Sequence, residues 1–406
     1  MFSILFLACT TPPADEAPPT WHNDVAPIVD AYCANCHTEG NYGGFDLSDY
    51  ETAHSMAEAI RISVVDRAMP PWMADSSCND YQYDLSLTDA QIDTIADWVE
   101  AGAPEGEPSA APEPAEAPEE RTLSRVDKVI EMEAPYTPVS SPDEYRCFVL
   151  DWPYEEDLYV TGFSLNPDNT NVVHHGIAFI LEPELAEEAL ALDAADDGQG
   201  YECFGGPGVA EAQDISWLGA WAPGGAAGDM PPGTGIGVSA GSKIVLQVHF
   251  NVQTSGASPA QVQLELMVEE SVEKPAMIQP WADPSWLLGE AMPIPANTDN
   301  VTHDFSYTLS RSNFNIHYTS LHMHTRGVAA RFWKTDADGN ETCLLDIPNW
   351  DFDWQRSYMF QEPIETNPGD TLTVECTWDN PTDDTIYWGD NTTDEMCLAT
   401  MYITTP

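Results

Sequence analysis

Half of the ten histidines in this 406-residue chain lie in three short groups within strand-like segments. The groups are His174 and His175 in "NVVHHGIAFI", His249 in "LQVHF", and His322 and His324 in "LHMHTRG". Alternate side chains of an extended strand share a face, so His322 and His324 should point toward the same spot. One buried histidine is usually a satisfied core residue, but five in such positions favour a metal site.

The ligand types also indicate which metal is expected. Imidazole nitrogens combined with a methionine sulfur suit copper, because the soft sulfur stabilises Cu(I) while nitrogen accommodates Cu(II). Zinc held by histidines alone is the alternative. The residues therefore predict copper first and zinc second.

A second chemical motif, "CANCH", stands near the N-terminus. In c-type haem attachment the thiols, here Cys33 and Cys36, add across the haem vinyl groups, and the adjacent His37 binds the iron. Zinc would need a second ligand pair, for which only Cys78 and His54 are nearby. We therefore predict a covalent haem.

The other axial ligand of the haem is expected in "RAMPPWM", which offers Met69 or Met73. We prefer Met69, because the two prolines that follow it stiffen the loop that would present the sulfur. Met69 as an ordinary core residue is the alternative.

The elements around the haem motif are predicted to be helical. Apolar residues recur at helical spacing in "WHNDVAPIVDAYC" and in "SLTDAQIDTIADWVEAG", where Thr88 begins the helix and Gly102 ends it. Residues 21–103 resemble a small bacterial cytochrome c domain. Residues 104–120 are acidic, rich in proline and without apolar periodicity, which predicts a semi-stiff linker.

The chain after residue 121 has a different texture. Short alternating runs such as "EYRCFVLDW", "DLYVTGFSL", "SKIVLQVHFNV", "QVQLELMV" and "DTLTVECTW" are separated by Gly, Pro, Asn and Asp. This pattern is typical of antiparallel sandwiches or jelly rolls. The predicted fold is therefore mostly β, with two antiparallel β-sandwich domains, 121–273 and 274–406, after a small all-α cytochrome c domain. The one helix expected in this region is "PELAEEALALDA".

Eight segments between residues 136 and 403 resemble the copper type II monooxygenases, the family of peptidylglycine α-hydroxylating monooxygenase and dopamine β-monooxygenase. In order, these are "DEYRCFVL", "VVHHGIAF", "GYECFGG", "LGAWAPGG", "GTGIGV…IVLQVHF", "LHMHTRG", "VECTWD" and "TTDEMCLATMYI". The resemblance implies two copper ions. His174, His175 and His249 would bind the electron-transfer copper, and His322, His324 and Met396 the catalytic copper that activates oxygen.

The resemblance also implies a disulfide pattern. Cys147 would pair with Cys203, and Cys376 with Cys397, which follows Met396 directly. Cys78 and Cys343 have no partner in the family; they are either free or bridge the cytochrome domain to the second sandwich. Six cysteines, an even number, remain after the haem pair and Cys9, and disulfides are the default in an oxidising compartment.

Two positions depart from the peptide-hydroxylating members of the family. Ser320 stands where those members have an arginine for a substrate carboxylate, and Thr400 stands in place of a substrate-contacting tyrosine. A peptidylglycine substrate is therefore not expected. We expect a less polar or uncharged substrate instead. Gln247 is present as in the family, and we expect it to support His249.

The implied function is a monooxygenase that uses O2 to hydroxylate an aliphatic C–H bond of a small organic substrate. The haem would pass on electrons from a donor, either ascorbate or a redox protein. The alternative is an exported copper- and haem-binding electron-transfer protein without hydroxylase activity. A third interpretation is a structural or adhesive lipoprotein with a sandwich fold. Such a protein needs no converging metal ligands, so this interpretation leaves the histidine groups unexplained.

Charge and the N-terminus limit the partners and the location. The formal charge of −55 would repel nucleic acid and anionic lipid. No internal stretch of apolar residues is long and apolar enough to span a membrane. "MFSILFLACT" (part of residues 1–20) resembles the end of a lipoprotein signal with Cys9 as the lipidated residue; an ordinary cleaved signal peptide is the alternative. The positive n-region is missing, so we expect the true start upstream. The predicted location is the periplasm or outer envelope, with a lipid anchor at Cys9 as the only membrane contact.

Overall fold

The computed structural model describes residues 17–38, 43–108, 121–209, 215–223, 225, 227–253, 255–288 and 291–406. It divides into a helical unit, residues up to 72 and 84–119, and a strand-rich unit, residues 73–83 and 120–406. Cys9 and most of the predicted linker, residues 109–120, lie outside the described residues. The predictions made for them stay predictions.

The helical unit contains the helices expected on both sides of the "CANCH" motif. Its elements are η1 (Trp21–Val25), α1 (Ala26–Tyr32), α2 (Tyr50–Ser55), α3 (Ala57–Val65) and α4 (Asp89–Glu100). Thr88 caps α4 as predicted: the Gln91 backbone N–H donates to its hydroxyl, and the Thr88 N–H donates to the Gln91 side chain. Trp21, Ile95 and Trp98 lie in the core of this unit.

The strand-rich unit confirms the mostly β prediction. Its first half holds β1 (Lys128–Glu131), β2 (Asp143–Asp151), β3 (Leu158–Pro167), β4 (Val173–Leu181), β5 (Tyr201–Glu202), β6 (Ser216–Trp221), β7 (Gly228–Asp229), β8 (Thr234–Val238), β9 (Lys243–Asn251) and β10 (Val262–Glu269). The predicted helix is α5 (Pro183–Ala195). All five strand segments quoted from the sequence form strands.

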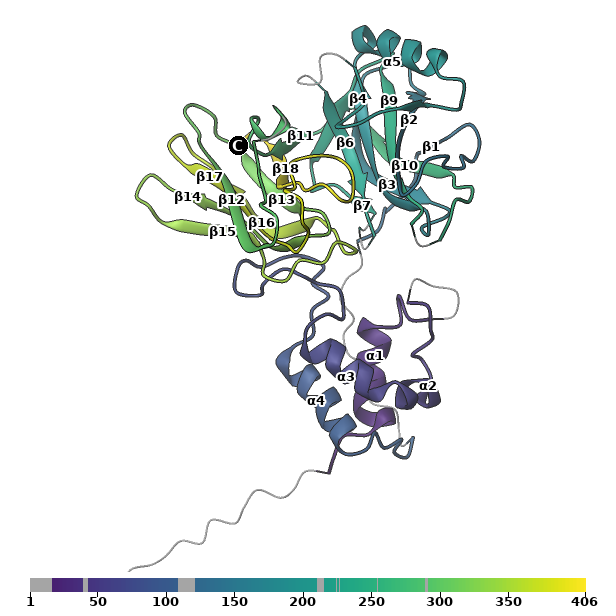
Figure 1. Ribbon diagram of the computed structural model, residues 1–406, viewed down its shortest axis with the longest axis vertical. Helices are drawn as coiled ribbons and strands as arrows, with labels where there is room; N and C mark the ends of the chain where they lie inside the picture. Colours follow the sequence, from purple (N-terminus) through teal and green to yellow (C-terminus); the bar gives the residue numbers. More distant parts are fainter. Residues whose placement is uncertain are drawn as a thin grey trace, which may run out of the picture. The chain divides into compact units, whose positions relative to one another are not determined.

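The second half of this unit contains β11 (Lys274–Trp281), the short helix η3 (Trp286–Leu288), β12 (Thr298–Thr308), β13 (Asn315–His322), β14 (Gly327–Thr335), β15 (Glu341–Ile347), β16 (Tyr358–Glu365), β17 (Thr371–Asn380) and β18 (Leu398–Thr404). One sheet has the order β12-β17-β14-β15, and β13 pairs with β16 and β18 (Figure 1).

Strand β11 joins the two halves into one hydrogen-bonded network. It pairs with β18 of the second half and with β6 and β8 of the first half. The expected division near residue 273 therefore falls at a strand that serves both halves. This continuity places β4 and β9, which carry one histidine group, in the same sheet as β13, which carries the other.

Residues Met73–Tyr83, inside the range predicted for the helical domain, pack with the strands instead. We call this segment the strap. The Tyr81 hydroxyl donates to the Leu344 carbonyl at 2.8 Å, and the Gln82 N–H donates to the Met359 carbonyl at 2.8 Å. The strap thus hydrogen-bonds to both β15 and β16.

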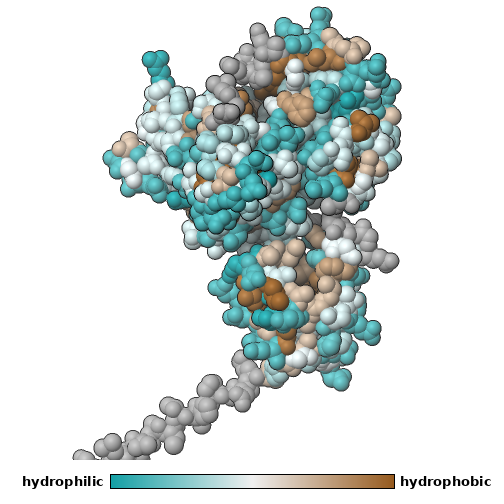
Figure 2. All heavy atoms as spheres, viewed as in Figure 1, coloured by the Kyte–Doolittle hydropathy of each residue, from teal (hydrophilic) through white to brown (hydrophobic). Residues whose placement is uncertain are grey.

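Exposed apolar side chains occur on both units. Figure 2 shows hydrophobic residues gathered on the visible face of the helical unit. Its exposed large apolar side chains are Phe45, Ile62 and Val65. Among the described residues, no helix is both long and apolar enough to cross a membrane.

Candidate metal centre

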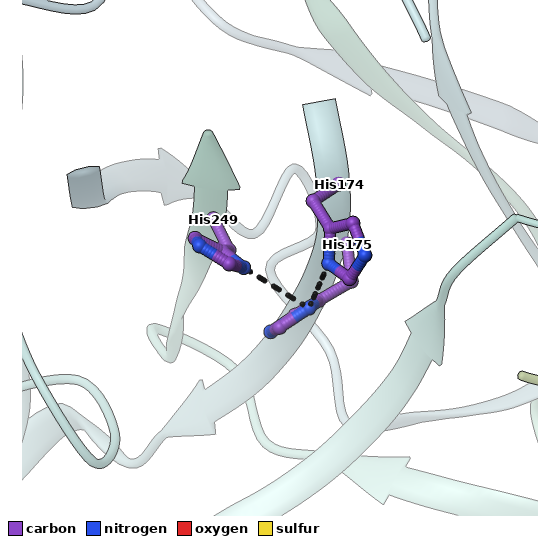
Figure 3. Close-up of side chains that lie close together, drawn as sticks. All are labelled: His174, His175 and His249. Carbon is purple, nitrogen blue, oxygen red and sulfur yellow. Dashed lines mark hydrogen bonds between the residues drawn. The ribbon is translucent and has the colours of Figure 1, made fainter. Parts of the chain in front are cut away.

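The first histidine group is formed by two neighbouring strands, β4 and β9. His175 pairs with His249 in the antiparallel register, but Val173 pairs with the next residue, Phe250. His174 is therefore the extra residue of a β-bulge. Adjacent residues of a regular strand point to opposite faces, and the bulge allows both His174 and His175 to face His249 (Figure 3).

The geometry of this group fits a metal ion. The His175 Nδ1 atom lies 3.1 Å from His174 Nδ1 and 3.4 Å from His249 Nδ1. A metal about 2.0 Å from each nitrogen, with angles of roughly 90–120°, separates its ligand nitrogens by roughly 2.8–3.5 Å. One nitrogen from each of the three residues can be chosen so that all lie within 4.8 Å of one another. The three residues can therefore hold one ion through nitrogen.

Burial keeps these imidazoles neutral, which is the form that binds metal. Desolvation lowers the pKa of His174 to about 3 and that of His175 well below the usual value. The pKa of His249 is lowered as well, for the same reason. Protons therefore compete weakly for the three ring nitrogens.

Asp143 on β2 fixes the tautomer of His249. Its Oδ1 atom accepts a hydrogen bond from His249 Nε2 at 2.9 Å, and hydrogen bonds from His249 and Thr392 outweigh burial and hold its pKa at about 2. The carboxylate is thus ionised, so Nε2 carries the proton and Nδ1 keeps its lone pair. Asp143 begins the segment "DEYRCFVL", but no local pattern in the sequence marks it as a partner of His249.

The second histidine group lies at the end of β13. The Oε1 atom of Gln355 lies 2.6 Å from His322 Nδ1, and the Asp394 carbonyl lies 3.2 Å from His324 Nδ1. Desolvation lowers the pKa of His322 to about 4 and that of His324 well below the usual value. Each ring has its Nδ1 engaged with an oxygen, which leaves Nε2 for a ligand.

Met396 belongs to a segment that contacts this group. His322, the last residue of β13, pairs with Leu398, the first residue of β18, two positions after Met396. Glu395 supports this arrangement, because its Oε2 atom accepts the His324 backbone N–H at 3.0 Å. The thioether predicted as a ligand therefore belongs to the segment beside His324.

The two groups are neighbours in the structure. The His175 and His322 ring centroids lie 5.8 Å apart. Phe352 stacks on His174 at 4.3 Å and meets His324 edge-on at 6.1 Å. The two ligand sets were predicted from the sequence, whereas their proximity and the contact with Phe352 were not.

The predicted disulfides are confirmed. Cys147 pairs with Cys203 and Cys376 with Cys397, and the open question about the other two is settled by a Cys78–Cys343 bond between the strap and β15. The expectation for Gln247 was wrong. Its side-chain amide donates to the Gly206 carbonyl at 3.0 Å and approaches Cys203, so it supports the disulfide loop and not His249.

Ser320 and Thr400 occupy paired positions on β13 and β18 and bind each other. Their hydroxyl oxygens are 2.6 Å apart. Ser320 precedes His322 by two residues and so shares its face of the strand. The polar atoms at this position are two mutually bonded hydroxyls, without a formal charge.

In the helical unit, the "CANCH" motif presents the two thiols and the imidazole that a covalent haem would need, and the haem itself stays a prediction. Cys33 and Cys36 remain thiols, whereas the other described cysteines form three disulfides. The His37 Nδ1 atom is buried without a hydrogen-bond partner, its ring lies 4.4 Å from that of Phe45, and a Cβ at Gly43 would fall 2.2 Å from Nδ1. Met69 is half-buried before a cis bond to Pro70; its role as a ligand stays a prediction.

Comparison with solved structures gives remote likenesses. One is the major capsid protein P2 of bacteriophage PM2, with a TM-score of 0.26 and 9% identity, covering 68% of this chain and 97% of that chain. Another is peptide:N-glycanase F, with a TM-score of 0.30 and 8% identity, covering 69% of this chain and 96% of that chain. A third is VP2 of infectious bursal disease virus, with a TM-score of 0.19 and 10% identity, covering 70% of this chain and 75% of that chain. TM-scores this low carry no argument about function. A search of curated proteins gave no match.

A family model, in contrast, matches the segment that carries the second histidine group. Residues 287–404 match the C-terminal domain of the copper type II ascorbate-dependent monooxygenases. The matched range contains His322, His324, Met396 and the Cys376–Cys397 disulfide. Residues 287–404 are therefore similar to a domain of a copper-dependent oxidoreductase family, which supports the resemblance noted in the sequence.

Proposed function

We propose that this chain is an exported copper monooxygenase. It uses O2 to hydroxylate an aliphatic C–H bond of a small, uncharged organic molecule, and it draws electrons through a haem on the same chain. The observation that carries the proposal is the family match over residues 287–404, which falls on a second histidine group lying 5.8 Å, ring to ring, from the first.

Two copper ions would store the electrons and activate dioxygen, one at His174, His175 and His249 and one at His322, His324 and Met396. The chain itself prepares the ligands. Asp143 holds the proton of His249 on Nε2, and burial keeps all five imidazoles neutral. The ligand nitrogens are thus ready without loss of a proton, so little reorganisation is needed on binding.

The surroundings of His322 favour a neutral substrate. Ser320 and Thr400 satisfy each other's hydroxyls two residues from His322 and offer no charge to a carboxylate. A hydroxyl pair can accept or donate one weak hydrogen bond, whereas a bidentate anchor for an anion needs a guanidinium. This supports an uncharged substrate and argues against an acidic peptide.

The helical unit completes the proposal. A haem attached at Cys33 and Cys36, with His37 and Met69 as axial ligands, would supply an electron-storing group that is refilled by ascorbate or a redox protein. Three disulfides suit an oxidising compartment, which supports export to the periplasm or outer envelope. The predicted lipid anchor at Cys9 remains part of the proposal.

The test is product formation with labelled oxygen. Copper-loaded full-length chain is supplied with ascorbate, ¹⁸O2 and a panel of small neutral molecules, and products are analysed by mass spectrometry. We expect one labelled oxygen atom per product and at least a hundredfold loss in His322→Ala, as expected for a ligand variant. His303→Ala, which changes a histidine outside both groups, should retain activity.

The same experiment decides between the enzyme and its alternative. If the chain binds copper and accepts electrons but consumes no more O2 than His322→Ala, it is an electron-transfer protein. Metal analysis after equal exposure to copper and zinc checks the metal, because two zinc ions retained in place of copper would overturn the assignment.

The haem is tested separately. Chain produced in a host with cytochrome c maturation should keep one haem through acid-acetone extraction, and Cys33→Ser or Cys36→Ser should weaken or abolish that attachment. Absence of covalent haem from matured protein would remove the relay from the proposal and leave the copper chemistry standing.

A further inference from the structure

One loop touches both histidine groups. It runs from Trp350 to Gln355 between β15 and β16, and we call it the bridging loop. Phe352 stacks on His174 of the first group, at 16° between the ring planes, and Gln355 contacts His322 of the second. Because both contacts come from one short segment, a shift of the loop must reach both groups.

The hydrogen bonds of Gln355 determine which nitrogen of His322 is protonated. Its Nε2 atom donates to the Phe352 carbonyl at 2.9 Å, which turns its Oε1 atom toward His322 Nδ1 at 2.6 Å. A carbonyl oxygen only accepts, so His322 Nδ1 must carry the proton. The lone pair therefore lies on Nε2, the nitrogen that is left for a ligand.

The loop is itself held at both ends. The Trp350 indole N–H donates to the His324 carbonyl at 3.1 Å, and the Gln355 backbone N–H donates to the Pro223 carbonyl at 3.3 Å. Gln355 is 8% exposed, so a lost hydrogen bond there is not replaced freely by water. At Asp351 the backbone N–H points to the Met73 sulfur of the strap at 3.3 Å.

We propose that the bridging loop positions both metal groups, with Gln355 selecting the metal-binding tautomer of His322 and Phe352 fixing the ring of His174. The proposal rests on the proposed function only in assuming that these histidines bind metal. Neither residue needs to touch substrate, so both are positioning residues. Carrying them on one loop couples the geometry of the two groups.

The tautomer is measured first, on the metal-free chain, by ¹⁵N NMR of histidine side chains. We expect the His322 proton on Nδ1 in the unchanged chain and in Gln355→Glu, whose carboxylate also accepts. Gln355→Leu should lose that preference. Gln253→Leu, an exposed glutamine changed in the same way, should leave the His322 signals unchanged.

Metal affinity is the second measurement. Removing a hydrogen-bond partner of a ligating histidine typically weakens binding 10- to 100-fold. We expect a loss of that size at the second group in Gln355→Leu and less than about threefold in Gln355→Glu. Phe352→Leu should weaken copper binding at the first group about 2- to 10-fold and change its Cu(II) spectrum, because the stacked ring is lost.

These outcomes separate the loop's role from the enzyme's. A proton on His322 Nε2 in the unchanged chain, or a Gln355→Leu chain with the same tautomer and copper affinity, would overturn the proposal. The tautomer result does not depend on hydroxylation, so it stands if no product is ever found. If Gln355→Leu does not fold, Gln355→Glu decides by itself: a His322 proton kept on Nδ1 supports the proposal, and a proton on Nε2 would overturn it.

Discussion

Five neutral imidazoles are useful as ligands only if each has its proton on the correct nitrogen. At three of the rings, an oxygen atom contacts one ring nitrogen and so fixes the proton there. These contacts are the Asp143 carboxylate with His249, the Gln355 side-chain amide with His322, and the Asp394 carbonyl with His324. The nitrogen left for a ligand is Nδ1 at His249 and Nε2 at the other two. Such partners raise ligand basicity and orient the ring.

Asp143→Ala should weaken metal binding at the first group by about 10- to 100-fold, because His249 would lose the acceptor that fixes its tautomer. Competition titration of copper against a chelator measures this loss. Asp151→Ala is the matched control, since Asp151 ends the same strand with an exposed side chain. Equal affinities in the two variants would contradict the assigned role of Asp143.

The histidines also predict how the metal-free chain responds to acid. An unfolded histidine has a pKa of about 6.5, while burial lowers it to about 3 at His174 and about 4 at His322. Between pH 6.5 and about 4 the unfolded chain therefore binds protons that the folded chain does not, so stability falls as pH falls. Glu395 acts in the opposite direction, because burial raises its pKa to about 7.

Burial also raises the pKa values of Asp346, Asp353 and Asp390. Because the five imidazoles outnumber these four carboxyls, we expect the Tm of the metal-free chain to drop from pH 7 to pH 4.5. His174→Phe should show a smaller drop, because its ring can stack on Phe352 but cannot bind a proton. His303→Phe changes a histidine outside both groups and should match the unchanged chain. An identical pH dependence in His174→Phe would show that His174 is not buried as neutral imidazole.

At the scale of elements, alternation of apolar residues predicted five of the strands, and "LQVHF" lies within β9 as expected. The strand expected over "LHMH" is confirmed only in part, because β13 ends at His322. The bulge at His174 could not be predicted, since a bulge depends on how β4 pairs with β9, 70 residues away. Asp143 and Gln355 were missed for the same reason: their partners lie 106 and 33 residues away, and neither has a local pattern. The disulfides were found through family resemblance, not from spacing.

The turn after β13 depends on one buried carboxylate. Glu395 accepts the backbone N–H groups of His324 and Arg326 and the indole N–H of Trp378, at 3.0, 2.6 and 2.8 Å. It also directly precedes Met396, so the same contacts hold the thioether segment against His324. Resemblance identified the ligands of this element but not the residue that holds them together.

Glu395→Ala should therefore lower the free energy of unfolding of the metal-free chain by roughly 2–5 kcal/mol, because three buried donors lose their acceptor. Glu395→Gln keeps one acceptor oxygen and should cost less. Urea unfolding followed by tryptophan fluorescence measures both. Glu362→Ala, on an exposed part of β16, serves as the control, and a similar small effect in all three variants would refute the role of Glu395.

At the scale of the whole molecule, the sequence predicted a helical domain, an acidic linker and two sandwiches, with Cys78 either free or a bridge. The strap Met73–Tyr83 could not be anticipated, because it lies between helical segments and has no strand pattern of its own. Its contacts with β15 and β16 make it part of the strand-rich unit. The predicted haem ligand Met69 is four residues before the start of the strap.

The strap gives the chain a connection that does not pass through the linker. If a protease site is inserted within residues 109–120 and cut, the piece that ends there still carries Cys78, which is bonded to Cys343 of the other piece. We expect one full-length band on a non-reducing gel and two bands after reduction. The Cys147→Ser/Cys203→Ser chain, which lacks a disulfide within the second piece, should behave in the same way.

In Cys78→Ser/Cys343→Ser the hydrogen bonds of Tyr81 and Gln82 should hold the pieces together in native buffer, and the pieces should separate in urea. Separation of the cut, unreduced and otherwise unchanged chain would show that the strap is not fastened to β15, and the support it gives to the bridging loop at Met73 would then have to be abandoned.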